Sequence, residues 1–428
     1  MKAVGIGIVL VALWSCVVSE IYEEADPCDT SKCFLPNCRC SDIRLNLTLN
    51  ELEIPQLVSV TFDDAITALI YTEVIDLFKK IVNPDGCKAK VGFYVSHEYT
   101  DYSKVHSLWA QGHEIGLHSI THGTDSDYWK HATAELMMEE FGQQIDIIER
   151  FANINRKDIK GLKVPYFEIS GDNSFVVADK LGLLYDASWS TQYLTDPGLW
   201  PYTMDYRSIQ DCPIGTCPTA SIPGFWINPL VDWTDDFGNK CVMMDACVVE
   251  DDSVEGIFQM MMKNFMVHYK GNRAPFGLYL HAAWLEKGDH NLEAFKLFLQ
   301  FLNEKPDVYF STPSQVIDFV KNPKTGIPFD NCRKTTRESC RSRLCPVKKE
   351  STGEDRWMTV CGQCPEVYPW LGNPTGKAQK KTTRRTRSTT KATTPLVKQN
   401  KLPVEDVSQT QEGTASNSRL LFPKFTRN

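Results

Sequence analysis

The sequence lacks a second long apolar run, an excess of positive charge and any repeat of fixed period. After residue 18 no apolar stretch reaches the ~20 residues needed to span a bilayer, so we expect no membrane span. The formal net charge of −8 over 428 residues argues against a nucleic-acid-binding protein. Segment 113–118 lacks the spacing of a zinc-protease helix, because its second histidine comes one residue late. These absences leave an ordinary globular composition, with 42% hydrophobic residues.

Cysteine, by contrast, is abundant and indicates an oxidising compartment. Residues 1–19 have the charged start, apolar centre and terminal small residue of a secretory signal peptide. Its removal takes away Cys16 and leaves fourteen of the fifteen cysteines, an even number that suggests seven disulfides of open connectivity. The alternative, a zinc ribbon at Cys361 and Cys364, is disfavoured because extracellular thiols rarely stay reduced. We therefore expect a secreted, extracellular protein, with a glycosylation sequon at 46–48.

Composition and periodicity divide the rest of the chain into regions. Strand and helix patterns alternate over the central part, which predicts an α/β domain with a parallel sheet, open or closed into a barrel. A Pro- and Cys-rich insert interrupts this alternation, and a second cysteine cluster follows it. The predicted regions are a Cys-rich N-terminal segment at 20–54, the α/β domain at 55–330 with its insert at 192–255, a Cys-rich C-terminal lobe at 331–372 and a disordered tail at 373–428.

The tail differs in charge from everything before it. It holds twelve Lys and Arg against three Asp and Glu, a net charge of +9, so residues 1–372 carry −17. Its eleven threonines and missing apolar periodicity are typical of a disordered segment. Two interpretations stay open, a solvated linker and a basic arm that docks on acidic matrix polymers.

Two segments carry residue types suited to metal chemistry. Asp63 and Asp64 follow an apolar strand pattern, at the strand end where α/β folds place their sites. His118 and His122 are four residues apart, close enough to share a metal if the segment is helical. Each pair alone is more often a turn or an incidental spacing, so neither decides the function.

Three further segments, each at or just after a strand candidate, complete the set: Lys163-Val164-Pro165-Tyr166, Asp186-Ala187-Ser188-Trp189 and Leu278-Tyr279-Leu280-His281. With these five segments in this order, residues 30–372 resemble the polysaccharide deacetylases of the NodB-homology type, carbohydrate esterase family four. Within that family they are most similar to the insect chitin deacetylases. The run from Cys332 to Gly372 also resembles the end of those insect proteins. We expect no chitin-binding module before the domain, which makes the chain more similar to the shorter, gut-type members.

The resemblance implies a fold and a role for each motif residue. The fold would be a distorted (β/α) barrel with a disulfide-rich N-terminal cap and C-terminal lobe. Asp64, His118 and His122 would bind Zn²⁺, a ligand set that leaves positions open for water and substrate. Asp63 would act as general base and His281 as general acid, with Asp186 orienting His281. The Tyr166 N–H would help to hold the oxyanion, and Trp189 would line the acetyl pocket.

Two features leave questions open. The third motif of the family usually begins with arginine, and Lys163 keeps the charge but loses the fork geometry, so Asp63 is expected to be held less well. In the insert, Trp200, Trp226 and Trp233 either stack on sugar rings or pack a small core of their own. Trp284, just after His281, is a further candidate for the substrate cleft.

The sequence thus predicts a secreted, zinc-dependent chitin deacetylase that releases acetate from chitin or chito-oligosaccharides. We expect it in an extracellular chitin matrix, such as the gut lining, and as a monomer. The alternative is a chitin-binding matrix protein that keeps the deacetylase fold with weak or no catalysis, for which Lys163 and the basic tail are the support. An esterase acting on another acetylated glycan is the third interpretation.

Overall fold

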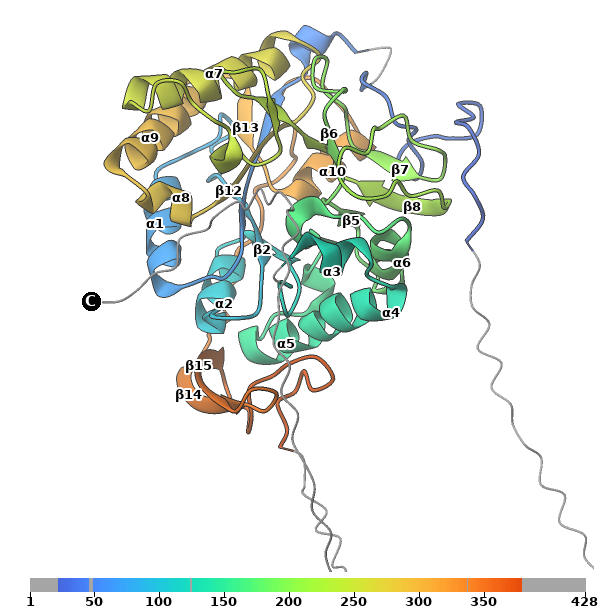
Figure 1. Ribbon diagram of the computed structural model, residues 1–428. Coiled ribbons are helices and arrows are strands. Elements are labelled where there is room, and N and C mark those ends of the chain that lie inside the picture. The colour runs from blue at the N-terminus through green and yellow to red at the C-terminus, as the bar shows by residue number, and fades with distance from the viewer. Residues whose placement is uncertain (1–21, 46–48, 124, 337, 379–428) are drawn as a thin grey trace, which may run out of the picture. The chain divides into compact units, whose positions relative to one another are not determined.

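A largely parallel sheet brings together segments that are far apart in the sequence (Figure 1). The computed structural model describes residues 22–45, 49–123, 125–336 and 338–378. The predicted signal peptide, the sequon and most of the tail lie outside them. The main sheet runs β12-β1-β2-β3-β4-β5-β8-β7, with β13 paired to β1. Its strands are β1 (Gln56–Asp63), β2 (Gly92–Val95), β3 (Glu114–Leu117), β4 (Gly161–Leu162), β5 (Tyr185–Asp186), β7 (Tyr202–Met204), β8 (Ile222–Ile227), β12 (Phe276–His281) and β13 (Val308–Phe310).

The sheet is parallel except for its antiparallel edge pair, β7 and β8. Strand β1 is buried along all eight residues, as expected where helices cover a parallel sheet. This confirms the predicted α/β class. No hydrogen-bonded ladder joins β12 to β7 or β8 within the described part of the chain, so closure into a barrel stays a prediction.

Helices surround the sheet, with α7 and α9 packed together on one side (Figure 1). The ten α-helices of the described residues are α1 (Ala68–Phe78), α2 (Tyr102–Ala110), α3 (Ser126–Lys130), α4 (Ala134–Met137), α5 (Gln143–Ala152), α6 (Asn173–Lys180), α7 (Val254–Lys270), α8 (Ala283–Glu286), α9 (Asp289–Asn303) and α10 (Pro313–Lys321). Shorter turns of helix are η1 (Glu51–Glu53), η2 (Met138–Gly142), η3 (Arg156–Asp158), η4 (Pro165–Phe167) and η5 (Met244–Ala246).

The helical segment from Ala134 to Ala152 consists of three pieces. A π-helical turn, η2, separates α4 from α5. Such turns are rare and often lie at functional sites. Here the turn carries Glu140, a fully buried carboxylate whose contacts belong to the candidate site.

The insert at 192–255 contributes strands to the main sheet. It supplies β7 and β8, and β8 pairs in parallel with β5. The small strands of the region are β6 (Ser190–Thr191), β9 (Leu230–Val231), β10 (Trp233–Thr234) and β11 (Lys240–Cys241). The buried Arg39 of the N-terminal segment donates to the Pro201 carbonyl at 2.7 Å, which attaches that segment to the insert.

Seven disulfides confirm the expected number and settle the connectivity. Two close the N-terminal segment, two close loops of the insert, two tie the C-terminal lobe, and one joins the domain to the lobe. The pairs are Cys28–Cys40, Cys33–Cys38, Cys212–Cys217, Cys241–Cys247, Cys340–Cys361, Cys345–Cys364 and Cys87–Cys332. The zinc-ribbon interpretation is excluded, because both of its cysteines are oxidised.

The C-terminal lobe is a hairpin of β14 (Ser342–Lys349) and β15 (Glu354–Cys361) that contacts α2 and α5. Buried His97 holds the segment after it: Nδ1 accepts from the Tyr102 hydroxyl at 2.6 Å, and Nε2–H donates to the Pro369 carbonyl at 2.8 Å. None of the helices within the described ranges has the length and apolar character that crossing a bilayer requires.

Candidate active site

The five motifs meet at the carboxyl edge of the sheet. Asp63 and His281 end β1 and β12 and are direct register partners in that parallel pair. His118 follows β3, Lys163 follows β4, and Asp186 ends β5. Because neighbouring parallel strands end at one edge, residues separated by more than 200 positions face the same space.

Asp64, His118 and His122 form a group of three side chains that could hold a metal ion. One ligand atom from each lies within 4.8 Å of the others. Asp64 Oδ1 is 3.2 Å from His122 Nε2 and 3.9 Å from His118 Nε2. One carboxylate and two imidazoles suit a transition metal such as Zn²⁺ and leave coordination positions for water and substrate. These residues therefore fit the metal that the sequence predicts.

Hydrogen bonds fix the tautomer of the buried histidine. His118 Nδ1–H donates to the Lys163 carbonyl at 2.7 Å, which leaves Nε2 with a free lone pair on the Asp64 side. Burial lowers the pKa of His118 to about 4, so the ring is neutral at neutral pH, as a metal ligand must be. A carbonyl partner behind a ligating histidine is the usual arrangement in metal sites.

The segment from His118 to His122 is a loop, not the helix on which the spacing argument depended. Glu140 holds it by accepting from the Ile120 and Thr121 N–H groups, each at 2.9 Å, and from the Thr121 hydroxyl at 2.5 Å. His122 itself adopts a left-handed backbone, with φ of 44°. Strained backbone of this kind persists where the surroundings hold it, often at functional sites.

Asp63 is buried against a single cation. Lys163 Nζ lies 2.9 Å from one Asp63 carboxylate oxygen and 3.1 Å from the other. Burial alone raises the pKa of Asp63, but Lys163, His118 and His281 together bring that pKa below its usual value. The carboxylate is therefore ionised at neutral pH, which a general base requires.

Three aromatic rings surround the Lys163 ammonium. Its Nζ lies 4.4 Å from the ring centre of Tyr94, 5.0 Å from Tyr279 and 6.0 Å from Phe167. Ring faces attract a desolvated cation by about 2 kcal/mol each at best. The cage and Asp63 together compensate for burying the Lys163 ammonium.

Asp245 holds His281, so the expectation that Asp186 does so is wrong. His281 Nδ1 lies 2.8 Å from Asp245 Oδ2, and its Nε2 lies 3.9 Å from Asp64 Oδ2. Burial lowers the pKa of His281, but the Asp245 carboxylate outweighs it and brings the pKa to about 9. The ring is thus protonated at neutral pH and directs Nε2–H towards the metal ligands.

Asp186 instead organises the neighbouring motif. It accepts from the Ser188 N–H at 2.7 Å and from the Ser188 hydroxyl at 3.0 Å. The Ser188 oxygen in turn accepts from the Val164 N–H at 2.8 Å. Burial raises the pKa of Asp186 to about 7. Asp186 therefore supports the turn that leads to Tyr166, whose φ is 59° and whose ring centre lies 5.7 Å from that of His122.

The insert tryptophans are core residues, so their interpretation as sugar-stacking platforms is wrong. Trp200, Trp226 and Trp233 are at most 2% exposed. Trp189 is 3% exposed, and its Nε1–H donates to the Asp211 carbonyl at 2.8 Å. No more than an edge of Trp189 can therefore reach an acetyl group. Only Trp284 of the five is half-buried.

Two residues of the site, Asp245 and Glu140, were missed in the sequence analysis. Asp245 lies within the short loop closed by Cys241 and Cys247, with no motif around it. Glu140 stands three residues after the buried Met137 and one before the buried Phe141. A carboxylate at a core position of a helix was the one available signal, since such a group needs buried donors.

The fold and the site together fit a metal-dependent hydrolase: three side chains that could hold a metal ion lie beside an ionised carboxylate and a protonated histidine. No family model matches the chain. It is 41% identical to chitin deacetylase 8 of Bombyx mori over 361 residues, which is 82% of this chain and 94% of that protein. It is 37% identical to chitin deacetylase 1 of Bombyx mori, covering 85% of this chain and 71% of that protein. The chain belongs to the chitin deacetylase family.

Solved structures match the chain at lower sequence identity. The chitin deacetylase of the fungal pathogen Colletotrichum lindemuthianum is 13% identical with a TM-score of 0.35, covering 61% of this chain and 88% of that one. The family 4 carbohydrate esterase of Streptomyces lividans, in complex with acetate, is 15% identical with a TM-score of 0.35, covering 61% of this chain and 95% of that one. The assignment to the family rests on the two sequence relatives.

Proposed function

We propose that this protein is a secreted, zinc-dependent chitin deacetylase, which hydrolyses N-acetyl groups of chitin or chito-oligosaccharides to glucosamine units and acetate. One observation carries the proposal: the register pair of Asp63 and His281 flanks the three metal ligands. An ionised carboxylate and a protonated imidazole thus stand on adjacent strands beside a metal site.

In this reaction the metal supplies Lewis-acid polarisation of the acetamide carbonyl and makes a nearby water more acidic. Asp63 accepts a proton as the water oxygen attacks the carbonyl carbon. The Tyr166 N–H donates to the oxygen on which negative charge develops. His281 then donates its Nε2 proton to the amine nitrogen as the C–N bond breaks, and glucosamine and acetate result.

The protonation states of the two groups match these roles. Lys163 keeps the pKa of Asp63 low, so Asp63 is ready to take a proton. Asp245 keeps the pKa of His281 at about 9, so His281 has a proton to give. Pairs of titratable groups whose surroundings move their pKa values apart are typical of acid–base catalysis. Each such group contributes about 10²–10⁴-fold to the rate.

The proposed location is an extracellular chitin matrix, such as that of a gut lining, with the enzyme acting as a monomer. The seven disulfides support an extracellular location, because disulfides persist in oxidising compartments. The polymer itself is the only partner that the site chemistry calls for.

The test is acetate release from chito-oligosaccharides by the purified protein, first with Zn²⁺, then with a chelator, then with Zn²⁺ restored. We expect release to stop with the chelator and to return with the metal. Asp63→Asn is the matched variant, because it removes the base and leaves all three metal ligands in place. Bound Zn²⁺ and chitin without any acetate release would contradict the enzyme and favour the matrix-protein interpretation.

A further inference from the structure

A cavity of about 750 Å³ lies beside His281, the proposed general acid. One wall is the insert turn at 244–249, which the Cys241–Cys247 disulfide closes. The other wall is the segment 284–291, from Trp284 in α8 to the start of α9. His290 Nδ1–H donates to the Asp252 carbonyl at 2.8 Å, so a hydrogen bond joins the second wall to the segment that follows the insert turn.

This cavity shares a residue with the catalytic centre. Asp245 lines it and also receives the hydrogen bond from His281 Nδ1. Its second oxygen, Oδ1, is buried and has no hydrogen-bond partner within the described part of the chain. Trp284 follows His281 by three residues and lines the same cavity. A polymer with its reacting acetamide at His281 therefore has a neighbouring sugar within reach of this space.

The lining combines apolar and charged side chains, which suits a sugar ring with its apolar C–H face and polar substituents. Met244, Ile257 and Met260 are buried apolar side chains, and half-buried Trp284 adds an aromatic face for the C–H side of a ring. The charged rim consists of Asp252, Asp289 and Lys287, all exposed. Asp245 is already paired with protonated His281, so the remaining lining charges are two carboxylates, Asp252 and Asp289, against one ammonium, a balance that favours a cationic ligand.

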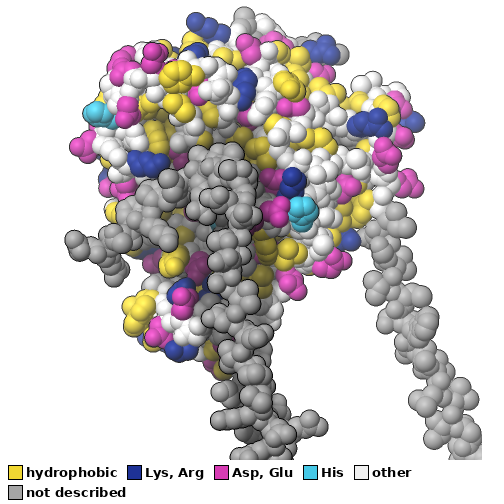
Figure 2. Space-filling model, viewed as in Figure 1, with side chains coloured by type: hydrophobic (Ala, Val, Ile, Leu, Met, Phe, Trp, Pro, Cys, Tyr) yellow, Lys and Arg dark blue, Asp and Glu magenta, His cyan; other side chains and the backbone are white. Residues whose placement is uncertain are grey.

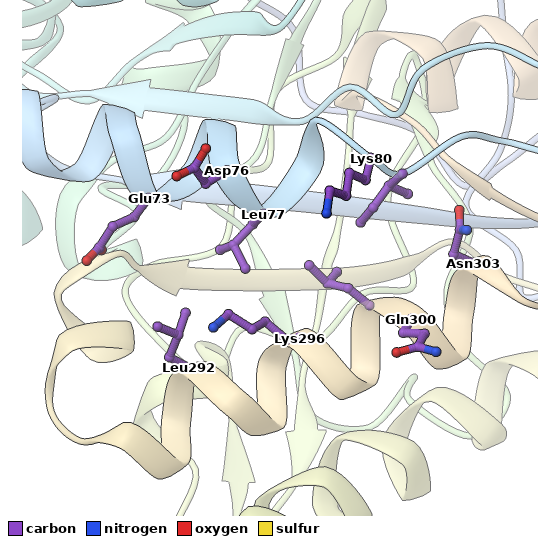
Figure 3. A pocket seen from close by; sticks show the side chains of 10 residues that line it. Glu73, Asp76, Leu77, Lys80, Leu292, Lys296, Gln300 and Asn303 are labelled. Carbon is purple, nitrogen blue, oxygen red and sulfur yellow. The ribbon is translucent and has the colours of Figure 1, made fainter.

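A second cavity, of about 500 Å³, lacks these properties. It lies between α1 and α9, lined by Leu77 and Leu292 with Glu73 and Lys296 (Figure 3). None of its lining residues belongs to the candidate site. We assign no substrate to it.

We propose that the cavity beside Asp245 binds a neighbouring sugar of the substrate chain whose 2-amino group is free, that is, a protonated glucosamine unit. This inference rests on the proposed function and adds a preference to it: partly deacetylated chains react faster than fully acetylated ones. The product of one turnover then becomes a better substrate for the next. Acidic side chains are spread widely over the visible face of the molecule, so the cavity's position beside His281, not acidity alone, distinguishes it (Figure 2).

The experiment compares kcat/KM for acetate release from two chito-oligosaccharides of equal length, one fully acetylated and one with a single glucosamine unit. We expect the wild-type protein to favour the second by about tenfold, the value of one charge-assisted hydrogen bond. Asp252→Asn should lower this ratio and Lys287→Gln should raise it. Asp355→Asn, an 82% exposed carboxylate on the β14–β15 hairpin, is the matched control and should leave it unchanged.

The outcomes separate this inference from the proposed function. Acetate release at equal rates from both oligosaccharides would keep the deacetylase and overturn the glucosamine site. A shift of the ratio in the same direction in both rim variants would overturn it too, because their charges change in opposite directions. No release from either substrate would overturn the proposed function and the inference together. A binding measurement supports the inference if fully deacetylated oligosaccharide inhibits acetate release from the substrate. This inhibition should be weaker in Asp252→Asn.

Discussion

Replacing Lys163 by methionine is expected to disable the base while leaving the metal site intact. Methionine stays unbranched but is one atom shorter, and it lacks the ammonium that lies 2.9 and 3.1 Å from the Asp63 oxygens. Burial, the largest influence on the pKa of Asp63, then raises that pKa with less opposition. The Lys163 carbonyl, which holds His118, belongs to the backbone and survives the substitution.

The magnitude follows from the burial of both partners, whose side chains are 0% and 1% exposed. Removing one partner of a buried ion pair costs about 3–5 kcal/mol of stability. Loss of a general base lowers kcat/KM by about 10²–10⁴-fold. The two effects have one cause, an unpaired buried carboxylate that takes up a proton.

The assay measures acetate release and bound Zn²⁺ on the same preparation, with thermal unfolding alongside. Lys163→Arg keeps the positive charge, and a guanidinium also stacks on aromatic faces. Its kcat/KM should therefore lie closer to that of the wild-type protein than to that of Lys163→Met. Lys348→Met, at an exposed position, is the matched control. If Lys163→Met binds one Zn²⁺ and keeps kcat/KM within about threefold of wild type, the assigned role of Lys163 is refuted.

Three further predictions concern residues that hold the site or the lobe. Asp245→Asn removes the carboxylate that raises the pKa of His281 to about 9. The decrease of kcat/KM at alkaline pH should therefore begin at lower pH in this variant. If that decrease begins at the same pH as in the wild-type protein, the pairing of Asp245 with His281 is contradicted. Glu140→Gln weakens the support of the histidine loop and should lower Zn²⁺ affinity by about 10–100-fold in calorimetry, and unchanged affinity would count against that support. Burial lowers the pKa of His97 to about 4 from 6.5, so the unfolded chain binds the proton first and stability falls by ~3 kcal/mol as pH drops from 6.5 to 4. Chemical denaturation across that range should show a smaller loss in His97→Gln, and equal losses would exclude His97 as a source.

The motif residues were predictable because they sit on strand ends. The apolar run before Asp63 identifies β1, and parallel strands deliver their carboxyl ends to one edge. That rule places Asp63, Asp64, His118 and His281 together without any knowledge of the packing. The tryptophans show its limit, because composition does not tell a stacking platform from a core side chain.

The α/β class and the number of disulfides were predictable from local patterns in the sequence, namely strand and helix periodicity and an even count of cysteines. The three candidate metal ligands were predicted from the resemblance to a known family, not from such a pattern. The sequence could not show which cysteines pair, that Glu140 holds the histidine loop, or that Asp245 rather than Asp186 holds His281; these follow from the folded structure. These are contacts between loops, whose positions depend on how the insert and helices pack, and no periodicity along the chain records that packing.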